Sequence, residues 1–290
     1  MNSRAIVLEA WANRAVAEMD SGRLAAFHLP RRMDRPLPGQ TVQLNARDEL
    51  IEVIPAKNRF GRGDPRGRFK PIAVDLDQAL IVIAPQPAPS PDLIHRYLAA
   101  CQLCEVDAVV VVNKADLKMP DQPPFCHLAD FETLGYRVIR TQCRPSADTA
   151  RLERVLSGQT TLIAGQSGVG KTSLVNAMIP DLQAQTGALS TVTGKGTHTT
   201  TSARLYRLPE GGWLVDTPGV WEYGLWSMLP RELVRGFPEF IPFRGRCRFR
   251  DCSHRSEPGC AIRDAAESGE LPGFRYQAWL RLLGEQARLA

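Results

Sequence analysis

Hydrophobic and polar positions follow different patterns in three successive parts of the chain. Residues 1–57 contain five short apolar runs, and turn signals such as Asp20-Ser21-Gly22 and Pro38-Gly39 separate several of them. The runs predict strands at 5–8, 14–19, 24–29, 41–44 and 50–54. Five short strands with little helix are typical of a small barrel such as the OB-fold, whose surface often binds oligonucleotides.

Two other interpretations of this first part remain open. Residues 8–19 also fit a helix, and a β-rich packing module without a ligand would show the same runs. Residues 59–70, which follow, are rich in Gly and Arg and predict a mobile connector into the next part.

Continuous apolar runs mark the middle of the chain. They predict strands at 72–74, 80–84, 107–112, 136–140, 160–164 and 213–215. The run at 107–112 has four consecutive valines, which suits a parallel sheet covered on both faces. Residues 92–105 have helical spacing, as do residues 261–290, whereas the polar stretch 183–202 predicts a mobile loop. The fold class is therefore α/β in the middle, with a β-rich unit before it and a helical unit after it.

A phosphate-binding loop stands at the centre of this middle part. Its eight residues match G-x-x-x-x-G-K-[ST] in full: Gly165, Gln166, Ser167, Gly168, Val169, Gly170, Lys171 and Thr172. A predicted strand precedes the loop, and a predicted helix begins near Ser173. Glycines let the backbone N–H groups surround phosphate oxygens, and the helix N-terminus adds positive potential. Lys171 is expected at the β- and γ-phosphates and the Thr172 hydroxyl at Mg²⁺.

A guanine-reading motif follows the valine strand. Asn113, Lys114, Ala115 and Asp116 form Asn-Lys-x-Asp at the carboxyl end of that strand, where open α/β sheets bind ligands. A carboxylate at Asp116 can accept hydrogen bonds from both N1–H and the N2 amino group of guanine, which adenine does not present together. The motif therefore predicts GTP rather than ATP. Thr141-Gln142-Cys143, at the place of the usual base-contacting turn, matches poorly.

Two further segments complete a GTPase motif set. Asp216-Thr217-Pro218-Gly219 follows a predicted strand, which places Asp216 near Mg²⁺ and the Gly219 N–H near the γ-phosphate. The polar stretch ends in Thr199, Thr200 and Thr201, one of which is expected to complete the Mg²⁺ coordination when the γ-phosphate is present. We take Thr199 and Thr200 as the candidates.

The order of these motifs is rotated. In ordinary GTPases the phosphate-binding loop comes first and Asn-Lys-x-Asp last, whereas here Asn113–Asp116 precedes Gly165. The sequence therefore predicts a circularly permuted GTPase, in which the C-terminal unit is joined directly to the second switch loop.

The catalytic residue is predicted at His198. Val220 stands where many GTPases carry the glutamine that orients the attacking water, and valine has no group for that task. A neutral imidazole at His198, in the first switch, can accept a proton from water. The alternative is a solvent-exposed histidine of a loop.

A metal site is predicted near the C-terminus. Cys247, Cys252, His254 and Cys260 supply three thiolates and one imidazole within fourteen residues. This donor set suits one tetrahedral Zn²⁺ with all four positions filled, which makes its role structural. The pair Cys101 and Cys104 fits either a redox or metal half-site or, more simply, buried cysteines of a helix.

Charge and composition bear on the partner and compartment. The net charge of +5 includes two basic blocks, Lys57–Lys70 with six basic residues and Arg244–Arg255 with five arginines. Such blocks suit a nucleic-acid surface or, alternatively, solvated loops. No run approaches the roughly 20 apolar residues of a membrane helix, and Arg4, Glu9, Arg14 and Glu18 interrupt any signal-peptide region. We expect a cytoplasmic protein that does not bind membranes.

Taken together, these motifs closely resemble those of the ribosome small subunit-dependent GTPase family called RsgA or YjeQ. The resemblance rests on residues 113–116, 165–172, 198–201, 216–220 and the Cys₃His set, and it extends from about 70 to 275. It implies an OB-fold, a permuted GTPase and a zinc domain. It also implies binding to the 30S subunit late in its maturation, release on hydrolysis, and stimulation by the subunit. The family's catalytic switch histidine corresponds to His198.

The sequence thus leads to a specific prediction. A short OB-fold-like domain is expected at 1–66, a circularly permuted GTPase domain at 67–226, and a zinc-binding, mostly helical domain at 227–290. The expected function is GTP hydrolysis in late maturation of the 30S ribosomal subunit, with 16S rRNA, GTP and GDP as partners and Mg²⁺ and one Zn²⁺ as cofactors. The alternative is a GTP-gated module that binds a non-ribosomal RNA. Nothing in the sequence requires more than a monomer.

Overall fold

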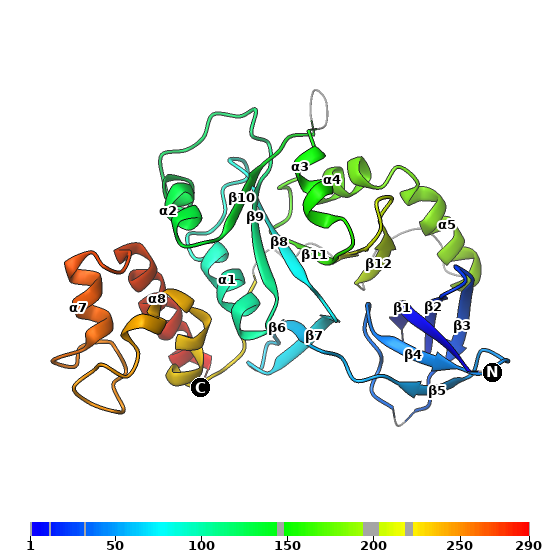
Figure 1. Cartoon of the computed structure of the whole chain (residues 1–290), viewed down its shortest axis with the longest axis horizontal. Coiled ribbons are helices and arrows are strands. Elements are labelled where there is room, and N and C mark those ends of the chain that lie inside the picture. The colour runs from blue at the N-terminus through cyan, green and yellow to red at the C-terminus, as the bar shows by residue number, and fades with distance from the viewer. Residues whose placement is uncertain are drawn as a thin grey trace.

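Three blocks of structure follow one another along the chain, as Figure 1 shows. The computed structural model describes residues 2–11, 13–31, 33–143, 148–193, 203–217 and 223–289. An N-terminal sheet and a C-terminal helical block lie on opposite sides of a central α/β block. No helix in these described ranges is long and apolar enough to cross a membrane.

The N-terminal block is a five-stranded antiparallel sheet. Its strands are β1 (Ser3–Trp11), β2 (Arg14–Met19), β3 (Leu24–His28), β4 (Thr41–Leu44) and β5 (Leu50–Val53), in the order β3-β2-β1-β4-β5. All five predicted strands are confirmed, and the alternative helix over residues 8–19 is wrong. Val7 to Ala10 are all buried because β1 packs its own core on one face and contacts β12 of the central block on the other.

The predicted mobile connector at 59–70 is wrong. Residues Arg59–Gly63 form β6, which pairs antiparallel with β7 (Phe69–Val74) as a hairpin whose turn lies at residues 64–68. Its glycines serve close packing, since a Cβ atom at Gly63 would lie 2.5 Å from the Leu225 carbonyl oxygen. Phe60 is buried in the main core. We define these two strands and their turn as the β6–β7 hairpin.

A six-stranded sheet forms the central block. Its strands are β8 (Gln78–Ile83), β9 (Asp107–Val112), β10 (Arg137–Arg140), β11 (Thr160–Ala164), β12 (Arg204–Arg207) and β13 (Trp213–Asp216). The order is β10-β9-β8-β11-β13-β12, with every neighbouring pair parallel except β12 and β13. Parallel neighbours place the ends of β8, β9, β11 and β13 at one edge of the sheet, which is where three of the predicted motifs lie.

Helices cover both faces of this sheet. α1 (Leu93–Leu103) packs in one core, whereas α3 (Ala150–Leu156) and α4 (Lys171–Met178) pack in the other. A short 3₁₀ turn, η1 (Phe125–His127), leads into α2 (Leu128–Thr133).

The predicted loop at 183–202 is wrong in its first half. Residues Leu182–Thr193 form helix α5, and α5 contacts β2 and β3 of the N-terminal sheet. The sequence lacks a strong apolar stripe there, and helix formation is favoured by tertiary contact with the sheet. Residues 194–202 lie outside the described part.

The C-terminal block is mainly helical, as predicted. It contains α6 (Pro230–Leu233), the 3₁₀ helices η2 (Val234–Gly236) and η3 (Pro238–Phe243), α7 (Ala261–Ser268) and α8 (Gly273–Leu289). Trp279 of α8 is fully buried in the core that continues into the central block. Ion pairs from Arg96 to Glu285 and from Arg281 to Asp92 join α8 to the α1 region.

Candidate functional site

The phosphate-binding loop spans the gap between β11 and α4. Gly165 has φ +142°, and a Cβ atom there would lie 2.2 Å from the Val82 carbonyl oxygen. Gly170, just before α4, has φ +94°, and its Cβ would lie 2.3 Å from Asn113 Nδ2. Only glycine fits either position, so the motif's glycines follow from packing as well as from the need to approach a phosphate.

Lys171 is fixed at the centre of this loop. Its Nζ donates hydrogen bonds to the carbonyl oxygens of Gly165 at 2.8 Å and Gln166 at 2.7 Å. Burial lowers the pKa of Lys171, and the nearby Asp216 carboxylate opposes that shift. The loop therefore holds a cationic ammonium group against its own backbone, as a polyphosphate site requires.

The guanine motif lies directly beside the loop. Asn113, at the end of β9, donates from Nδ2 to the Val169 carbonyl oxygen at 2.8 Å. Lys114 has φ +57°, and its Nζ reaches the carbonyl oxygen of Gly168 at 2.8 Å. Asp116 is exposed and available to a base. Motifs separated by about fifty residues in sequence thus share one hydrogen-bonded unit.

The end of β13 brings a carboxylate to the same edge. Asp216 of β13 lies opposite Ile163 of β11, and β11 is the strand that leads into the phosphate-binding loop. Burial raises the pKa of Asp216, and Lys171 opposes that rise. Thr172 and Ser173 are exposed at the start of α4. A threonine hydroxyl with a carboxylate is an oxygen donor set that fits Mg²⁺.

Four predicted residues cannot be placed. His198, Thr199 and Thr200 lie in residues 194–202, and Gly219 lies in residues 218–222, both outside the described part. Their roles stay predictions.

The loop after β8 belongs to the site, and the sequence did not reveal it. Gln166 Nε2 donates to the carbonyl oxygens of Pro87 and Ala88, each at 3.1 Å. Lys114 Nζ donates to the Gln86 carbonyl oxygen at 2.7 Å. These acceptors are backbone atoms, so no side chain in the proline-rich sequence indicated a contact with the site. The sequence predicted only a break between two elements.

The predicted zinc ligands converge in the C-terminal block. One ligand atom from each of Cys247, Cys252, His254 and Cys260 lies within 4.8 Å of all the others. His254 Nδ1 is 3.4 Å from Cys247 Sγ and 3.5 Å from Cys260 Sγ. A tetrahedral ion with Zn–S bonds of about 2.3 Å separates its ligand atoms by roughly 3.5–3.8 Å, so the residues fit Zn²⁺. Within the described part this is the one Cys, His and carboxylate cluster with such spacing.

A carboxylate absent from the predicted site shapes the metal loop. Glu257 accepts hydrogen bonds from the Ser253 N–H at 2.7 Å and from the Arg255 N–H at 3.0 Å. The Ser253 hydroxyl, together with the backbone N–H groups of Glu257 itself, Ser253 and Ser256, lowers the pKa of Glu257 to about 2. The ionised carboxylate thereby fixes the turn that carries His254, whose φ is +58°.

Cys101 and Cys104 are not part of the Cys₃His cluster. Both are buried at the C-terminal end of α1, and burial raises the pKa of each thiol, that of Cys104 to about 11. They are the buried cysteines of a helix and its end.

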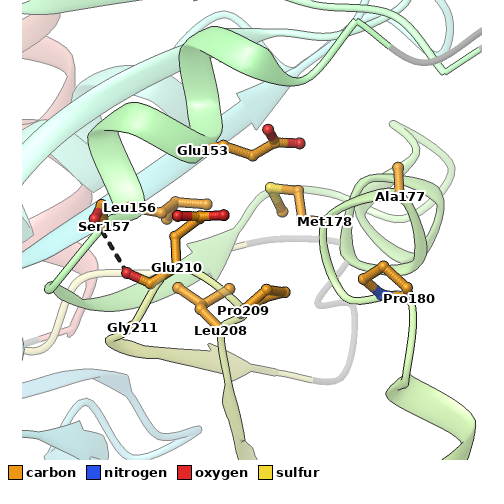
Figure 2. A pocket seen from close by; sticks show the side chains of 10 residues that line it. All are labelled: Glu153, Leu156, Ser157, Ala177, Met178, Pro180, Leu208, Pro209, Glu210 and Gly211. Carbon is orange, nitrogen blue, oxygen red and sulfur yellow. Dashed lines mark hydrogen bonds between the residues drawn. The ribbon is translucent and has the colours of Figure 1, made fainter.

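A separate small cavity of about 190 Å³ lies at the far end of the sheet (Figure 2). The last turns of α3 and α4 and the turn between β12 and β13 line it. Ser157 Oγ donates to the Glu210 carbonyl oxygen there at 3.2 Å. It contains none of the motif residues and is distinct from the nucleotide edge.

Comparison with known proteins identifies the family. The model of the RsgA GTPase family matches residues 53–226. A small ribosomal subunit biogenesis GTPase RsgA of Actinobacillus pleuropneumoniae serotype 5b is 39% identical over 288 residues, covering 96% of this chain and 84% of the relative. A protein of the same name from Chromohalobacter salexigens is 44% identical over 236 residues, covering 81% and 69%.

Solved structures agree with the fold. The crystal structure of YjeQ from Thermotoga maritima superposes with a TM-score of 0.78 at 26% identity, covering 99% of both chains. YloQ, described as a circularly permuted GTPase, gives a TM-score of 0.76 at 24% identity over 100% of this chain and 96% of its own. The permuted fold read from the motif order is therefore confirmed, and the chain belongs to the RsgA GTPase family.

Proposed function

We propose that this GTPase binds the 30S ribosomal subunit, assists its late maturation, and hydrolyses GTP to GDP and phosphate there. The relatives that align over most of the chain are named small ribosomal subunit biogenesis GTPases. The observation that carries the nucleotide part is the 2.8 Å hydrogen bond from Asn113 Nδ2 to the Val169 carbonyl oxygen. It holds the guanine motif against the phosphate loop, so that one GTP can span both.

We assign the following roles to the site residues. Asp116 accepts hydrogen bonds from guanine, the stem of Lys114 covers the base, and Asn113 with Ala115 supports the motif. The N–H groups of residues 165–173 surround the phosphates, with Lys171 at the β- and γ-phosphates. Thr172 and Asp216, with Thr199 or Thr200, would hold Mg²⁺, and the bound ion would neutralise charge on the phosphates.

His198 is the proposed catalytic residue. Its imidazole takes a proton from the attacking water, and the Gly219 N–H donates to the γ-phosphate. Without the usual glutamine, turnover of the isolated protein is expected at about 10⁻⁴ to 10⁻² s⁻¹. Replacement by alanine should lower turnover and leave GTP affinity nearly unchanged.

The other assignments complete the proposal. One structural Zn²⁺ binds Cys247, Cys252, His254 and Cys260. The domains are 1–66, 67–226 and 227–290, the first boundary lying in the turn of the β6–β7 hairpin. The protein acts as a monomer in the cytoplasm and contacts 16S rRNA.

RNA capture separates the proposed function from its alternative, a GTP-gated module for a non-ribosomal RNA. The tagged protein is loaded with a non-hydrolysable GTP analogue, retrieved from cells, and its bound RNA is sequenced, with Lys171→Ala as the matched control. Enrichment of 16S rRNA that Lys171→Ala loses supports the proposal. Enrichment of another RNA without 16S rRNA refutes the ribosomal part.

A further inference from the structure

The strand β12 carries an arginine that lies near two carboxylates from different blocks of the structure. β12 is the edge strand of the central sheet and contacts β1 of the N-terminal sheet, as Figure 1 shows. Arg204, at the start of β12, lies opposite Asp216 in the antiparallel register with β13. Its Nε lies 2.8 Å from Oε2 of Glu9 in β1. One guanidinium is therefore close both to the carboxylate proposed for Mg²⁺ and to a carboxylate of the N-terminal sheet.

These three side chains lie where little water can screen their charges. The side chains of Glu9 and Arg204 are only 1% and 13% exposed, and Asp216 is half-buried. Residues that lie opposite each other in an antiparallel pair point to the same face of the sheet, with Cβ atoms about 4.5–5.5 Å apart. An arginine side chain is long enough to cover that distance. The position of the Arg204 charge should therefore affect the Asp216 carboxylate strongly.

Glu9 is the carboxylate that holds Arg204. Within the described part of the chain, no other carboxylate lies within 4.0 Å of the Arg204 guanidinium, so no ion pair joins Arg204 to Asp216. Burial raises the pKa of Asp216, and the positive charges of Lys171 and, more weakly, Arg204 oppose that rise. The charge of Arg204 is thus felt at Asp216 although its contact is with Glu9. Without Glu9, that charge would compete with a divalent cation for the same carboxylate.

We propose that Glu9 and Arg204 are positioning residues for the Mg²⁺ site, in which Glu9 holds and neutralises Arg204 and leaves the Asp216 carboxylate available to Mg²⁺. The inference rests on the proposed GTPase function and assigns two residues that the nucleotide motifs do not include. Both residues act through Asp216. Because Glu9 belongs to β1, the N-terminal sheet contributes to Mg²⁺ affinity at a distance. By linkage, a ligand that separates β1 from β12 would weaken Mg²⁺ binding, and Mg²⁺ would oppose that ligand equally.

A second ion pair between the same two blocks provides a matched control. Glu18 of β2 pairs with Arg207 at the other end of β12. Arg207 lies opposite Trp213, at the start of β13, whereas Asp216 is at the end of that strand. Glu18→Gln therefore removes the same charge from the same interface without releasing a cation beside Asp216.

The test measures how nucleotide binding depends on Mg²⁺. A fluorescent, non-hydrolysable GTP analogue is titrated into the full-length protein at a series of free Mg²⁺ concentrations and in EDTA. The proteins are wild type, Glu9→Gln, Arg204→Gln, the double variant of these two, and Glu18→Gln. Circular dichroism verifies that each is folded at the assay temperature. The EDTA titration gives the affinity for the metal-free nucleotide, which should be the same in all five.

The two single variants should shift the Mg²⁺ requirement in opposite directions. Glu9→Gln should raise the free Mg²⁺ needed for half-maximal binding by about tenfold, because Arg204 is left uncompensated. Tenfold corresponds to about 1.4 kcal/mol, well within the interaction of two unit charges in a partly buried site. Arg204→Gln should lower the requirement by about threefold, because the Glu9 charge then adds to the attraction for Mg²⁺. The double variant and Glu18→Gln should behave as wild type does.

A merely structural ion pair would shift both single variants in the same direction, and that result would overturn the inference. So would a Mg²⁺ requirement that neither variant changes, and the proposed function would still stand. Because the expected shifts have opposite signs, either single variant that folds decides the question. If wild type binds the analogue equally well in EDTA, the proposed Mg²⁺ site and this inference both fail. If 30S subunits fail to stimulate GTP turnover while the opposite shifts are observed, only the ribosomal part of the proposed function fails.

Discussion

The ion pair between Glu9 and Arg204 holds the N-terminal sheet to the strand that follows the first switch. Glu9 lies in β1 and Arg204 at the start of β12, with Arg204 Nε 2.8 Å from Glu9 Oε2. The side chains are only 1% and 13% exposed, so little water replaces a lost partner. Replacing Glu9 with Gln removes the negative charge while nearly preserving the side chain's shape.

The expected cost follows from this burial. Breaking a buried ion pair by removing one partner costs about 3–5 kcal/mol, since the remaining charge stays poorly solvated. Because Arg204 keeps partial contact with water, the loss of stability in Glu9→Gln should lie near the lower end of this range, at about 3 kcal/mol. A second pair between the same two blocks, Glu18 with Arg207, has an arginine that is 55% exposed. Glu18→Gln should therefore cost less than about 1 kcal/mol.

Urea unfolding followed by circular dichroism measures both variants, and Arg204→Gln with the double variant completes a cycle. A coupling energy of about 2 kcal/mol or more between positions 9 and 204 is expected. If Glu9→Gln unfolds within 0.5 kcal/mol of Glu18→Gln, the buried pair does not hold the sheet in place and the reasoning fails.

Three other changes test the site. Asp116→Asn should weaken GTP binding by about ten- to a hundredfold, because a charged acceptor for two guanine donors is lost, and fluorescent-nucleotide titration would contradict this by showing unchanged affinity. Gly170→Ala should abolish nucleotide binding in a folded protein, since its Cβ would lie 2.3 Å from Asn113 Nδ2. Unchanged GTP affinity in that variant would refute the assigned loop geometry. Glu257→Gln should release Zn²⁺ to a chelator faster than Glu267→Gln, a carboxylate on α7 outside the metal loop, and equal release rates would show that Glu257 does not fix the loop.

The sequence predicted those parts of the fold that depend on local pattern. The valine run of β9, the short strands of the first block and the glycine positions of the phosphate loop each have a local cause. The permuted order could be read directly, because each motif follows its own strand. The four residues of the proposed zinc site could be named because their spacing in the sequence allows one ion to reach all four side chains.

Structural features that depend on contacts between residues far apart in the sequence could not be predicted. The Gly- and Arg-rich stretch at 59–70 predicted mobility, yet Gly63 allows the hairpin to pack against the Leu225 backbone, and Gly61 leaves room for the partner strand at Phe69 and Lys70. Helix α5 lacks an amphipathic pattern and lies against the N-terminal sheet. The Gln86 carbonyl oxygen accepts a hydrogen bond from Lys114 of the guanine motif, and those of residues 87 and 88 accept from Gln166 of the phosphate-binding loop, without any side-chain signal in residues 86–88. Each of these contacts joins residues that only the tertiary structure brings together.

The rate of GTP hydrolysis with and without ribosomal subunits tests the central claim most directly. Phosphate release by the purified protein is measured alone, with 30S subunits, and with 50S subunits at the same concentration. The account predicts a many-fold increase with 30S subunits, little change with 50S subunits, and no activity in Lys171→Ala under any condition. Equal rates with and without 30S subunits would contradict it.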